Sequence, residues 1–375
     1  MTASSIPASS LRGHGARLTI DLAALGENWR RLVDAAGSET AAVVKADAYG
    51  CGIPRVAPAL WAAGCRTFFV AHLSEAAAAR AALPPEAVIY VLNGFPPGSA
   101  GAYRALDVRP VLGSREEIAE WAQAGEGAPA ALHVDTGMNR LGLGPDEALA
   151  LAGGPLLSRV APALLMSHLV SAEVPGDPIT ARQAGSFARL RAAFPGVPAS
   201  LANSSGVFLG ESVRHDLARP GYALYGGNPT PGRPNPMRPV VRLEAEIAQI
   251  REVGPGETAG YNARWTAPGP RRLATLSLGY ADGFPRAASN RGEALVGGVR
   301  CPFVGVVSMD LVILDVTEVP VEALRRGAPA VLIGDALDLD TVGRNAGTIG
   351  YEILTGLGSR YDRRHLDEAG HRAPG

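Results

Sequence analysis

From residue 40 onward, short apolar runs alternate with alanine-rich stretches whose apolar spacing is typical of amphipathic helices. Helix candidates such as PRVAPALWAAG and SREEIAEWAQAG lie between most of the runs. Parallel strands are joined by crossover helices and are buried on both faces, so this alternation predicts a parallel sheet. The eight strand candidates are TAAVVKAD (40–47), TFFVAH (67–72), AVIYVLN (87–93), VRPVL (108–112), AALHVD (130–135), ALLMSHL (163–169), PASLANS (198–204) and HDLARPG (215–221).

The number of these units decides between two folds. Eight strand–helix units are expected for a (β/α)8 barrel of the TIM type. A doubly wound sheet is the competing fold, and it usually has a G-x-G-x-x-G loop after its first strand. Here AYGCGIP follows the first run and does not match that loop. We therefore predict an α/β protein with an N-terminal barrel over residues 17–235.

The pattern changes after the proline-rich segment NPTPGRPNPMRP. Strand-like runs such as VVRLEAEIAQIREV and PAVLIGD follow it, and helical spacing is scarce until near the C-terminus. This change predicts a second, mostly β domain over residues 236–375. The strand-like RLTIDL (17–22) is a candidate partner for that domain. Residues 1–16 are small and polar, and we expect them to form a flexible tail.

Composition and charge exclude several classes of protein. With 47% hydrophobic and 19% charged residues, the chain can bury a core and is not typical of a disordered protein. The formal net charge of −1 and the lack of a basic block argue against nucleic acid or acidic lipid as the partner. No apolar run is long enough to cross a membrane, and the N-terminus lacks a secretory apolar stretch, so we expect a cytoplasmic protein. The cysteines Cys51, Cys65 and Cys301 lack metal-ligand spacing, and we expect no disulfide framework and no metal site.

Lys45 is the first candidate for chemistry, because it stands at the end of the first apolar strand. Active sites of such barrels lie at the carboxyl ends of the strands. Burial there is costly for a charged amine unless the amine is paired or functional. Desolvation also lowers the pKa of an amine, which suits Schiff-base formation with an aldehyde cofactor. The alternative is a lysine whose amine reaches solvent.

Four further candidates lie at the same predicted edge. Arg219 ends the eighth strand, where a structural ion pair is the alternative to a functional role. The NSSG segment (203–206) ends the seventh strand and offers hydroxyls and N–H groups to a phosphate. His168 ends the sixth strand, and Arg140 ends the Gly-rich DTGMNR. Their alternatives are a hydrogen-bonded polar residue and a solvated arginine. Together these residues predict a lysine-bound aldehyde cofactor that carries a phosphate.

The sequence also resembles the alanine racemase family. VVKADAYG is similar to the family's cofactor-lysine motif, and HVDTGMNRLGL, NSSG, ARPGYALYG, GYNARW, LGYADG, VSMD and TIGYE follow in the family's order. The resemblance runs from about residue 17 to 365 and covers both predicted domains. It implies pyridoxal phosphate (PLP) as cofactor, a small amino acid as substrate, and a homodimer whose active sites are shared between subunits.

The resemblance assigns a role to each matching residue. It implies that Lys45 binds the cofactor covalently and is one catalytic base, and that Tyr261 from the partner subunit is the other. Arg219 bonds the pyridine nitrogen, His168 lies beside the ring, and Arg140 meets the phenolic oxygen and the substrate carboxylate. The implied phosphate contacts are Tyr49, Asn203, Ser204, Gly221, Tyr222 and Tyr351. The implied lining of the substrate pocket, again from the partner, is Tyr280 and Met309.

The implied activity is an isomerase that interconverts L-alanine and D-alanine by a two-base mechanism and supplies D-alanine for cell-wall peptidoglycan. Arginine keeps its protons, so Arg219 can only donate to the ring nitrogen, which weakens the ring as an electron sink and disfavours transamination. The chain departs from the family pattern at two positions. His133 replaces a lysine that many members carry in carbamylated form, and Ser308 replaces a common cysteine.

Three alternatives stay open on the sequence. A broad-spectrum or serine racemase of the same family would differ only in pocket size. A barrel-fold PLP decarboxylase would carry a GGG phosphate loop and a Cys-Asp pair in its β domain, and neither is found. A non-catalytic PLP carrier would be a single barrel, without the second domain that holds Tyr261.

Overall fold

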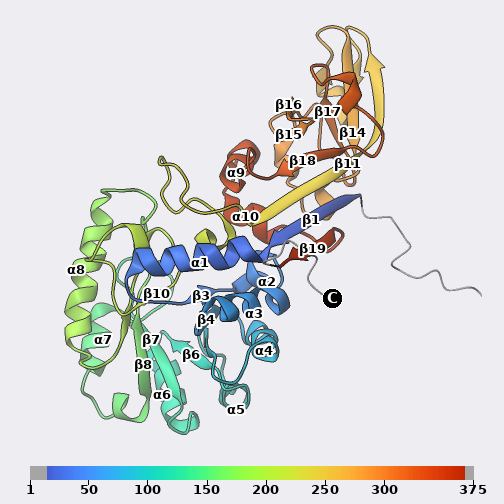
Figure 1. Ribbon diagram of the computed structural model, residues 1–375. Helices are drawn as coiled ribbons and strands as arrows, with labels where there is room; N and C mark the ends of the chain where they lie inside the picture. The colour runs from blue at the N-terminus through green and yellow to red at the C-terminus, as the bar shows by residue number, and fades with distance from the viewer. Residues whose placement is uncertain (1–14, 368–375) are drawn as a thin grey trace, which may run out of the picture. The chain divides into compact units, whose positions relative to one another are not determined.

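The computed structural model describes residues 15–367 (Figure 1). Of the predicted tail, residues 1–14 lie outside the described residues, and Ala16 already belongs to the first strand. The chain forms two compact units, the first of which is Leu22–Val240, while the second contains the rest of the described chain. None of the described helices is long and apolar enough to cross a membrane.

The first unit is a parallel barrel. Strands β3 to β9 form one sheet in chain order, and β10 pairs with β2. The N–H groups of Ala41 and Val43 donate to the carbonyls of Ala218 and Pro220, which closes the sheet between its first and last strands. This architecture confirms the predicted barrel. Its strands are β2 (Glu39–Thr40), β3 (Ala42–Val43), β4 (Thr67–Val70), β5 (Val88–Val91), β6 (Arg109–Leu112), β7 (Pro129–His133), β8 (Ala161–Met166), β9 (Ala199–Ser200) and β10 (Leu217–Ala218).

Helices surround these strands (Figure 1). They form because their apolar residues recur at helical spacing; in α1, for example, Leu25, Trp29 and Leu32 are buried on one face. The strands themselves are buried on both faces, as in β4, where all four residues are buried. The helices are α1 (Leu22–Ala36), α2 (Lys45–Tyr49), α3 (Ile53–Ala63), α4 (Leu73–Ala82), α5 (Ala100–Ala105), α6 (Arg115–Ala124), α7 (Pro145–Leu151) and α8 (Pro178–Ala192), with 3-10 turns η2 (Leu157–Arg159), η3 (Gly206–Phe208) and η4 (Tyr222–Tyr225).

The second unit is mostly β, as predicted. Its main sheet has the order β16-β15-β18-β11-β1-β19, and β14 and β17 extend it from β11. The first of the described strands, β1, pairs antiparallel with β11 and parallel with β19. The strands are β1 (Ala16–Asp21), β11 (Val241–Val253), β12 (Thr258–Ala259), β13 (Trp265–Thr266), β14 (Arg271–Leu276), β15 (Glu293–Val296), β16 (Val299–Pro302), β17 (Val312–Asp315), β18 (Pro329–Ile333) and β19 (Asp362–Leu366). The helices are α9 (Leu339–Ala346) and α10 (Gly350–Thr355), with 3-10 turns η5 (Tyr261–Ala263), η6 (Tyr280–Asp282), η7 (Arg286–Ala288) and η8 (Val321–Ala323).

Strand β11 organises this unit because it pairs with three others. Its N-terminal half alternates between buried and exposed positions, so one face joins the core. The pairing register shifts between Ile247 and Gln249, where the strand turns from one set of partners to another. Such a bulge bends a strand and increases its twist. One long strand can therefore pair with β1 and β18 at one end and with β14 at the other.

Candidate active site

Five predicted residues lie together at the carboxyl edge of the barrel. Lys45 follows β3, His133 ends β7, and His168 follows β8. Asn203 follows β9, and Arg219 follows β10. Because the strands of a closed parallel barrel all end at one rim, the fold brings these side chains to the same place.

The backbone turns sharply after Lys45. Four consecutive non-glycine residues, Ala46 to Tyr49, have φ between 51° and 56°. The predicted strand 40–47 therefore ends at Val43, because left-handed residues cannot continue a strand. This conformation costs about 1–2 kcal/mol for each residue and persists only where neighbouring contacts fix it. Here the Asp47 carboxylate accepts the N–H of Ile53 at 2.8 Å, and the Tyr49 ring stacks on Tyr225 with 4.6 Å between ring centroids.

The Lys45 amine is held in a more easily deprotonated state than a free lysine. Burial lowers its pKa, and the nearby charge of Arg140 lowers the pKa further. The Glu75 carboxylate acts in the opposite direction and raises the pKa. A partly desolvated amine with a lowered pKa is the form in which lysine acts as nucleophile or base.

Arg219 is a buried cation whose orientation is fixed. Its Nη2 donates to the Ser167 carbonyl at 2.6 Å, and its Nη1 donates to the Ser200 hydroxyl. Ser200 in turn donates to the Leu217 carbonyl at 2.6 Å. Burial lowers the pKa of Arg219 to about 10, so the guanidinium stays protonated at neutral pH and acts only as a donor.

The rim carries a surplus of positive charge. Burial lowers the pKa of His168 to about 3, and the charges of Arg219, Arg140 and Lys45 act in the same direction. Burial, Arg219 and Arg140 likewise lower the pKa of His133 to about 4, although Asp135 opposes them. Both imidazoles are therefore neutral at neutral pH. A group of cations that suppresses protonation of its neighbours favours an anionic ligand.

The lowered pKa of His133 makes stability depend on pH. The unfolded chain takes up a proton near pH 6.5, whereas folded His133 does so only near pH 4. Stability is therefore full above about pH 6.5 and falls as the pH drops toward 4, by about 2–3 kcal/mol for this group. We expect His133→Asn to reduce the loss of unfolding free energy between pH 7 and pH 4.5, measured by denaturant titration. An unchanged pH slope would contradict this assignment.

The ends of β9 and β10 form a polar turn suited to a phosphate. The Ser204 hydroxyl accepts the N–H groups of Gly221 at 3.0 Å and Ala223 at 3.2 Å. Asn203 accepts the N–H of Gly206 at 2.9 Å. A side chain at Gly221 would overlap the Tyr49 hydroxyl, so the glycine lets Tyr49 approach this turn. The structure thus brings together Tyr49, Asn203, Ser204 and Gly221, and Tyr222 follows as a buried residue of η4.

Arg140 is exposed and reaches the rim from a loop that Asp135 organises. The Asp135 carboxylate accepts the N–H groups of Gly137, Met138 and Asn139, each at 2.8 Å. Asn139 has φ 55°, a conformation that asparagine tolerates better than most residues. The charge of Arg140 acts on Lys45 and on both rim histidines, which agrees with its predicted location.

The remaining predicted residues belong to the second unit. The N–H of Tyr280 donates to the Ser308 carbonyl at 3.0 Å, so the segments that carry Tyr280 and Met309 lie side by side. Tyr261 is 68% exposed between β12 and β13, Met309 is 53% exposed and Tyr280 is 41% exposed. Exposed groups of large apolar side chains are typical of binding surfaces. Tyr351 is half-buried at the start of α10.

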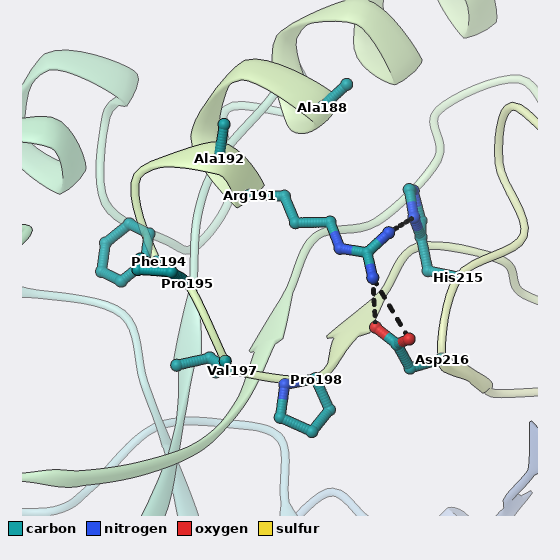
Figure 2. A pocket seen from close by; sticks show the side chains of 10 residues that line it. Ala188, Arg191, Ala192, Phe194, Pro195, Val197, Pro198, His215 and Asp216 are labelled. Carbon is teal, nitrogen blue, oxygen red and sulfur yellow. Dashed lines mark hydrogen bonds and ion pairs between the residues drawn. The ribbon is translucent and has the colours of Figure 1, made fainter.

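A hollow of about 650 Å³ lies at the opposite, amino end of β9 and β10 (Figure 2). Its charged side chains already neutralise each other, since Arg191 pairs with Asp216 at 2.8 Å and meets His215 at 3.3 Å. Asp216 also accepts the N–H of Ala199 at 2.8 Å and so joins the two strands. In barrels, this end serves stability and the other end serves catalysis. We therefore assign the hollow no chemistry.

Comparison with known proteins identifies the chain. The family model "Alanine racemase, N-terminal domain" matches residues 20–229, and "Alanine racemase, C-terminal domain" matches residues 240–365. The chain belongs to the alanine racemase family.

Individual relatives agree with this family. The chain is 75% identical to the alanine racemase of Methylobacterium nodulans, over 94% of this chain and 97% of that protein. It is 47% identical to the "Alanine racemase, catabolic" of Agrobacterium fabrum, over 94% and 93% respectively. The alanine racemase of Bartonella henselae, solved "with covalently bound pyridoxal phosphate", matches with a TM-score of 0.90 at 39% identity, over 94% of this chain and 99% of that one. These findings confirm the predicted family and enzyme class, a PLP-dependent isomerase.

The described residues fit this cofactor. PLP carries an aldehyde, a phenolate and a phosphate, and the racemase rim offers an amine at Lys45 and a surplus of cations around it. The polar turn at Ser204 and Gly221 supplies short polar groups at the position where barrels commonly bind phosphate.

Sequence reasoning missed the residues that support this rim. Gln183 of α8 is fully buried and donates to the His168 carbonyl at 2.9 Å and to the Thr136 hydroxyl at 3.1 Å. Glu75 of α4 accepts the N–H of Ala46, next to Lys45, at 2.6 Å. For Glu75 a weak signal exists, because it lies in the first turn of the helix candidate SEAAAARAAL, where acidic side chains are favoured. For Gln183, only its polarity within an otherwise apolar helix face could have indicated a role.

Proposed function

We propose that this chain interconverts L-alanine and D-alanine by a two-base mechanism, with Lys45 of one subunit and Tyr261 of its partner as the bases. We further propose that the product supplies peptidoglycan synthesis in the cytoplasm. The observation that carries the proposal is the Lys45 amine with its lowered pKa, beside four cationic or imidazole side chains at the end of a barrel strand. Membership of the alanine racemase family supports it.

Lys45 has two tasks in this proposal. Its amine would hold the cofactor through the aldehyde group, and the same amine would move the α-proton of the substrate on one face. Deprotonation is the requirement for both tasks, and burial together with Arg140 lowers the pKa of the amine in that direction. The left-handed turn that follows Lys45 fixes the backbone from which the amine extends.

Arg219 and His168 would hold the cofactor ring. When bound, PLP supplies the electron sink that allows the α-proton of an amino acid to leave. Arg219 remains protonated and can only donate to the ring nitrogen, which limits how far electrons are drawn into the ring. We infer that this bond favours return of the proton over transamination. His168, neutral at neutral pH, would lie beside the ring without adding a charge.

Arg140 would bind the substrate carboxylate and the phenolic oxygen. No carbamylated lysine is available to orient it, because His133 occupies that position in the family pattern. We propose that neutral His133 or a bound anion takes over this task, and the lowered pKa of His133 supports the neutral form. Tyr49, Asn203, Ser204, Gly221, Tyr222 and Tyr351 would contact the phosphate.

Tyr261 would deliver and remove the proton on the opposite face. Racemisation requires that a proton leave one face of the α-carbon and return to the other, which two opposed bases achieve without turning the substrate. Its phenol is 68% exposed in a single chain, which fits a role in the site of a second subunit. Tyr280 and Met309, also exposed, would line the partner's substrate pocket and set its size.

Incubation of the purified PLP-loaded protein with single L-amino acids tests the activity. We expect D-alanine from L-alanine at equal final amounts of the two enantiomers, and slower conversion of L-serine. A faster reaction with serine would indicate the broad-spectrum alternative. Release of carbon dioxide from a basic amino acid, with no D-product, would support a decarboxylase and contradict the proposal.

The physiological direction needs a separate experiment, since one relative bears the name of a catabolic enzyme. We expect expression of this chain to restore growth of a bacterial strain that requires added D-alanine. The inactive Lys45→Ala variant serves as control. Growth restored by both forms, or by neither while activity is present in extracts, would contradict a role in peptidoglycan supply.

A further inference from the structure

One carboxylate connects the turn after Lys45 to the next strand of the barrel. Glu75 Oε1 accepts the N–H of Ala46 at 2.6 Å. Glu75 Oε2 accepts the N–H groups of Ala71 at 2.7 Å and His72 at 3.1 Å, at the end of β4 and the start of α4. Both carboxylate oxygens therefore accept hydrogen bonds. They connect the backbone N–H that follows Lys45 to the junction between β4 and α4.

The barrel contains the same arrangement a second time. Glu117 is the third residue of α6, as Glu75 is the third residue of α4. Its two oxygens accept the N–H groups of Phe95 at 2.9 Å and Gly113 at 2.6 Å, which follow β5 and β6. A glutamate at this helix position thus joins two successive strand ends, and the connection itself is a means of stabilising the barrel.

The two glutamates differ in what they hold. Glu117 holds the N–H of Phe95, which follows a glycine-containing turn with no reactive side chain. Glu75 holds the first residue of a run of four left-handed residues that starts directly after the amine-bearing Lys45. Such a run is costly and needs external contacts to persist. We therefore expect loss of the Glu75 contact to loosen the start of this segment, directly after Lys45, while Asp47 and Tyr49 keep their own contacts.

We propose that Glu75 is a positioning residue for Lys45: its carboxylate fixes the left-handed turn through the Ala46 N–H and places a negative charge beside the amine. This inference rests on the proposed function of Lys45. The groups whose charges act on Lys45 are Arg140, which favours the neutral amine, and Glu75, which favours the ammonium. The third titratable neighbour is His168, whose pKa is lowered in part by the charge of Lys45.

Glu75→Gln tests the inference, and Glu117→Gln is the matched control. A glutamine has one acceptor oxygen, so it can keep the N–H groups of Ala71 and His72 only by turning its NH2 toward the N–H of Ala46. Glu117→Gln loses one of its two hydrogen-bonded connections in the same way. It does so at the ends of β5 and β6, which are not neighbours of β3, the strand before Lys45. Both variants are expected to lower the thermal unfolding midpoint to a similar extent.

Three readouts then separate positioning from stability. In the holoenzyme, amide hydrogen exchange of residues 46–50 should accelerate only in Glu75→Gln, and kcat at saturating cofactor and alanine should fall roughly tenfold to a hundredfold. In the cofactor-free full chain, Lys45 is the only lysine, so amine labelling followed by mass spectrometry of its peptide reports on one side chain. Its pKa should fall in Glu75→Gln, because the charge that raises it is gone. Glu117→Gln should leave all three readouts as in the wild type.

Equal changes in both variants would overturn the inference, because Glu75 would then act only as a helix cap. If Glu75→Gln fails to fold, Glu75→Asp provides the second test: it keeps the charge and shortens the reach, so exchange at 46–50 should rise while the labelling profile changes less. Unchanged exchange in a folded Glu75→Asp would also contradict the inference. A wild-type protein without racemase activity would refute the proposed function, whereas the exchange and labelling data would still decide the role of Glu75.

Discussion

Lys45→Ala is expected to abolish the covalently bound cofactor and to reduce racemase activity by at least about 10³-fold, because nucleophile and base are lost together. Lys45 is the only lysine among the 375 residues. No other side-chain amine can take its place, so no residual covalent binding is expected. The unfolding midpoint should change little, since alanine already occupies two of the four positions in the left-handed turn that follows Lys45.

Borohydride reduction provides the direct measurement. In the wild type, reduction should fix the cofactor to the peptide that contains VVKADAYG, as detected by mass spectrometry. Lys45→Arg is the matched control, because it keeps a positive charge and similar length but has a guanidinium that does not form the bond. A label fixed at another position, or activity retained in either variant, would refute the assignment of Lys45.

Mixing two inactive variants is expected to restore about a quarter of wild-type activity, because random pairing makes half of the dimers mixed and each mixed dimer has one intact site of two. The variants are Lys45→Ala and Tyr261→Phe. If each site takes Lys45 from one subunit and Tyr261 from the other, one site of the mixed dimer collects both defects. The second site is then complete. The measurement is alanine racemisation after co-expression or co-refolding in equal amounts.

A double variant, with both substitutions in one chain, supplies the control. When it is mixed with wild-type chain, every site of a mixed dimer lacks one of the two residues in the shared-site arrangement. Only wild-type dimers then work, and activity should fall to about a quarter rather than to about a half. No recovery from the two single variants, with mixed dimers demonstrated by native mass spectrometry, would mean that each site is formed within one chain.

The alternation of apolar runs predicted the barrel because burial on both faces leaves a strong signal in each strand. The same signal placed Lys45, His168 and Arg219 at strand ends, where the structure has them. It misjudged the first strand, which ends at Val43, because a left-handed turn of alanine, aspartate and tyrosine has no signature in hydropathy. Such a conformation is fixed by distant contacts rather than by local preference.

The roles of the supporting side chains Glu75 and Gln183 could not be predicted from the sequence, for a related reason. Glu75 and Ala46 are 29 positions apart, and Gln183 and Thr136 are 47 apart. A hydrogen bond between such residues depends on how closed strands align at the rim, and no spacing rule along one element describes it. The residues of the second unit, such as Tyr261, could be predicted only through family motifs, because an exposed tyrosine between two short strands has no distinctive pattern.

The position of β1 has a consequence for synthesis. This strand is made before the whole barrel, yet its neighbours are β11 and β19, which follow the barrel in the sequence and the second of which ends at Leu366. Throughout translation of the barrel, the backbone groups of Ala16–Asp21 therefore have no strand to pair with. Unpaired strand edges are prone to bind other chains, and pairing across so long a stretch is slow. The nascent chain must therefore keep β1 unpaired until β11 has been made, and the other edge of β1 stays open until β19 follows.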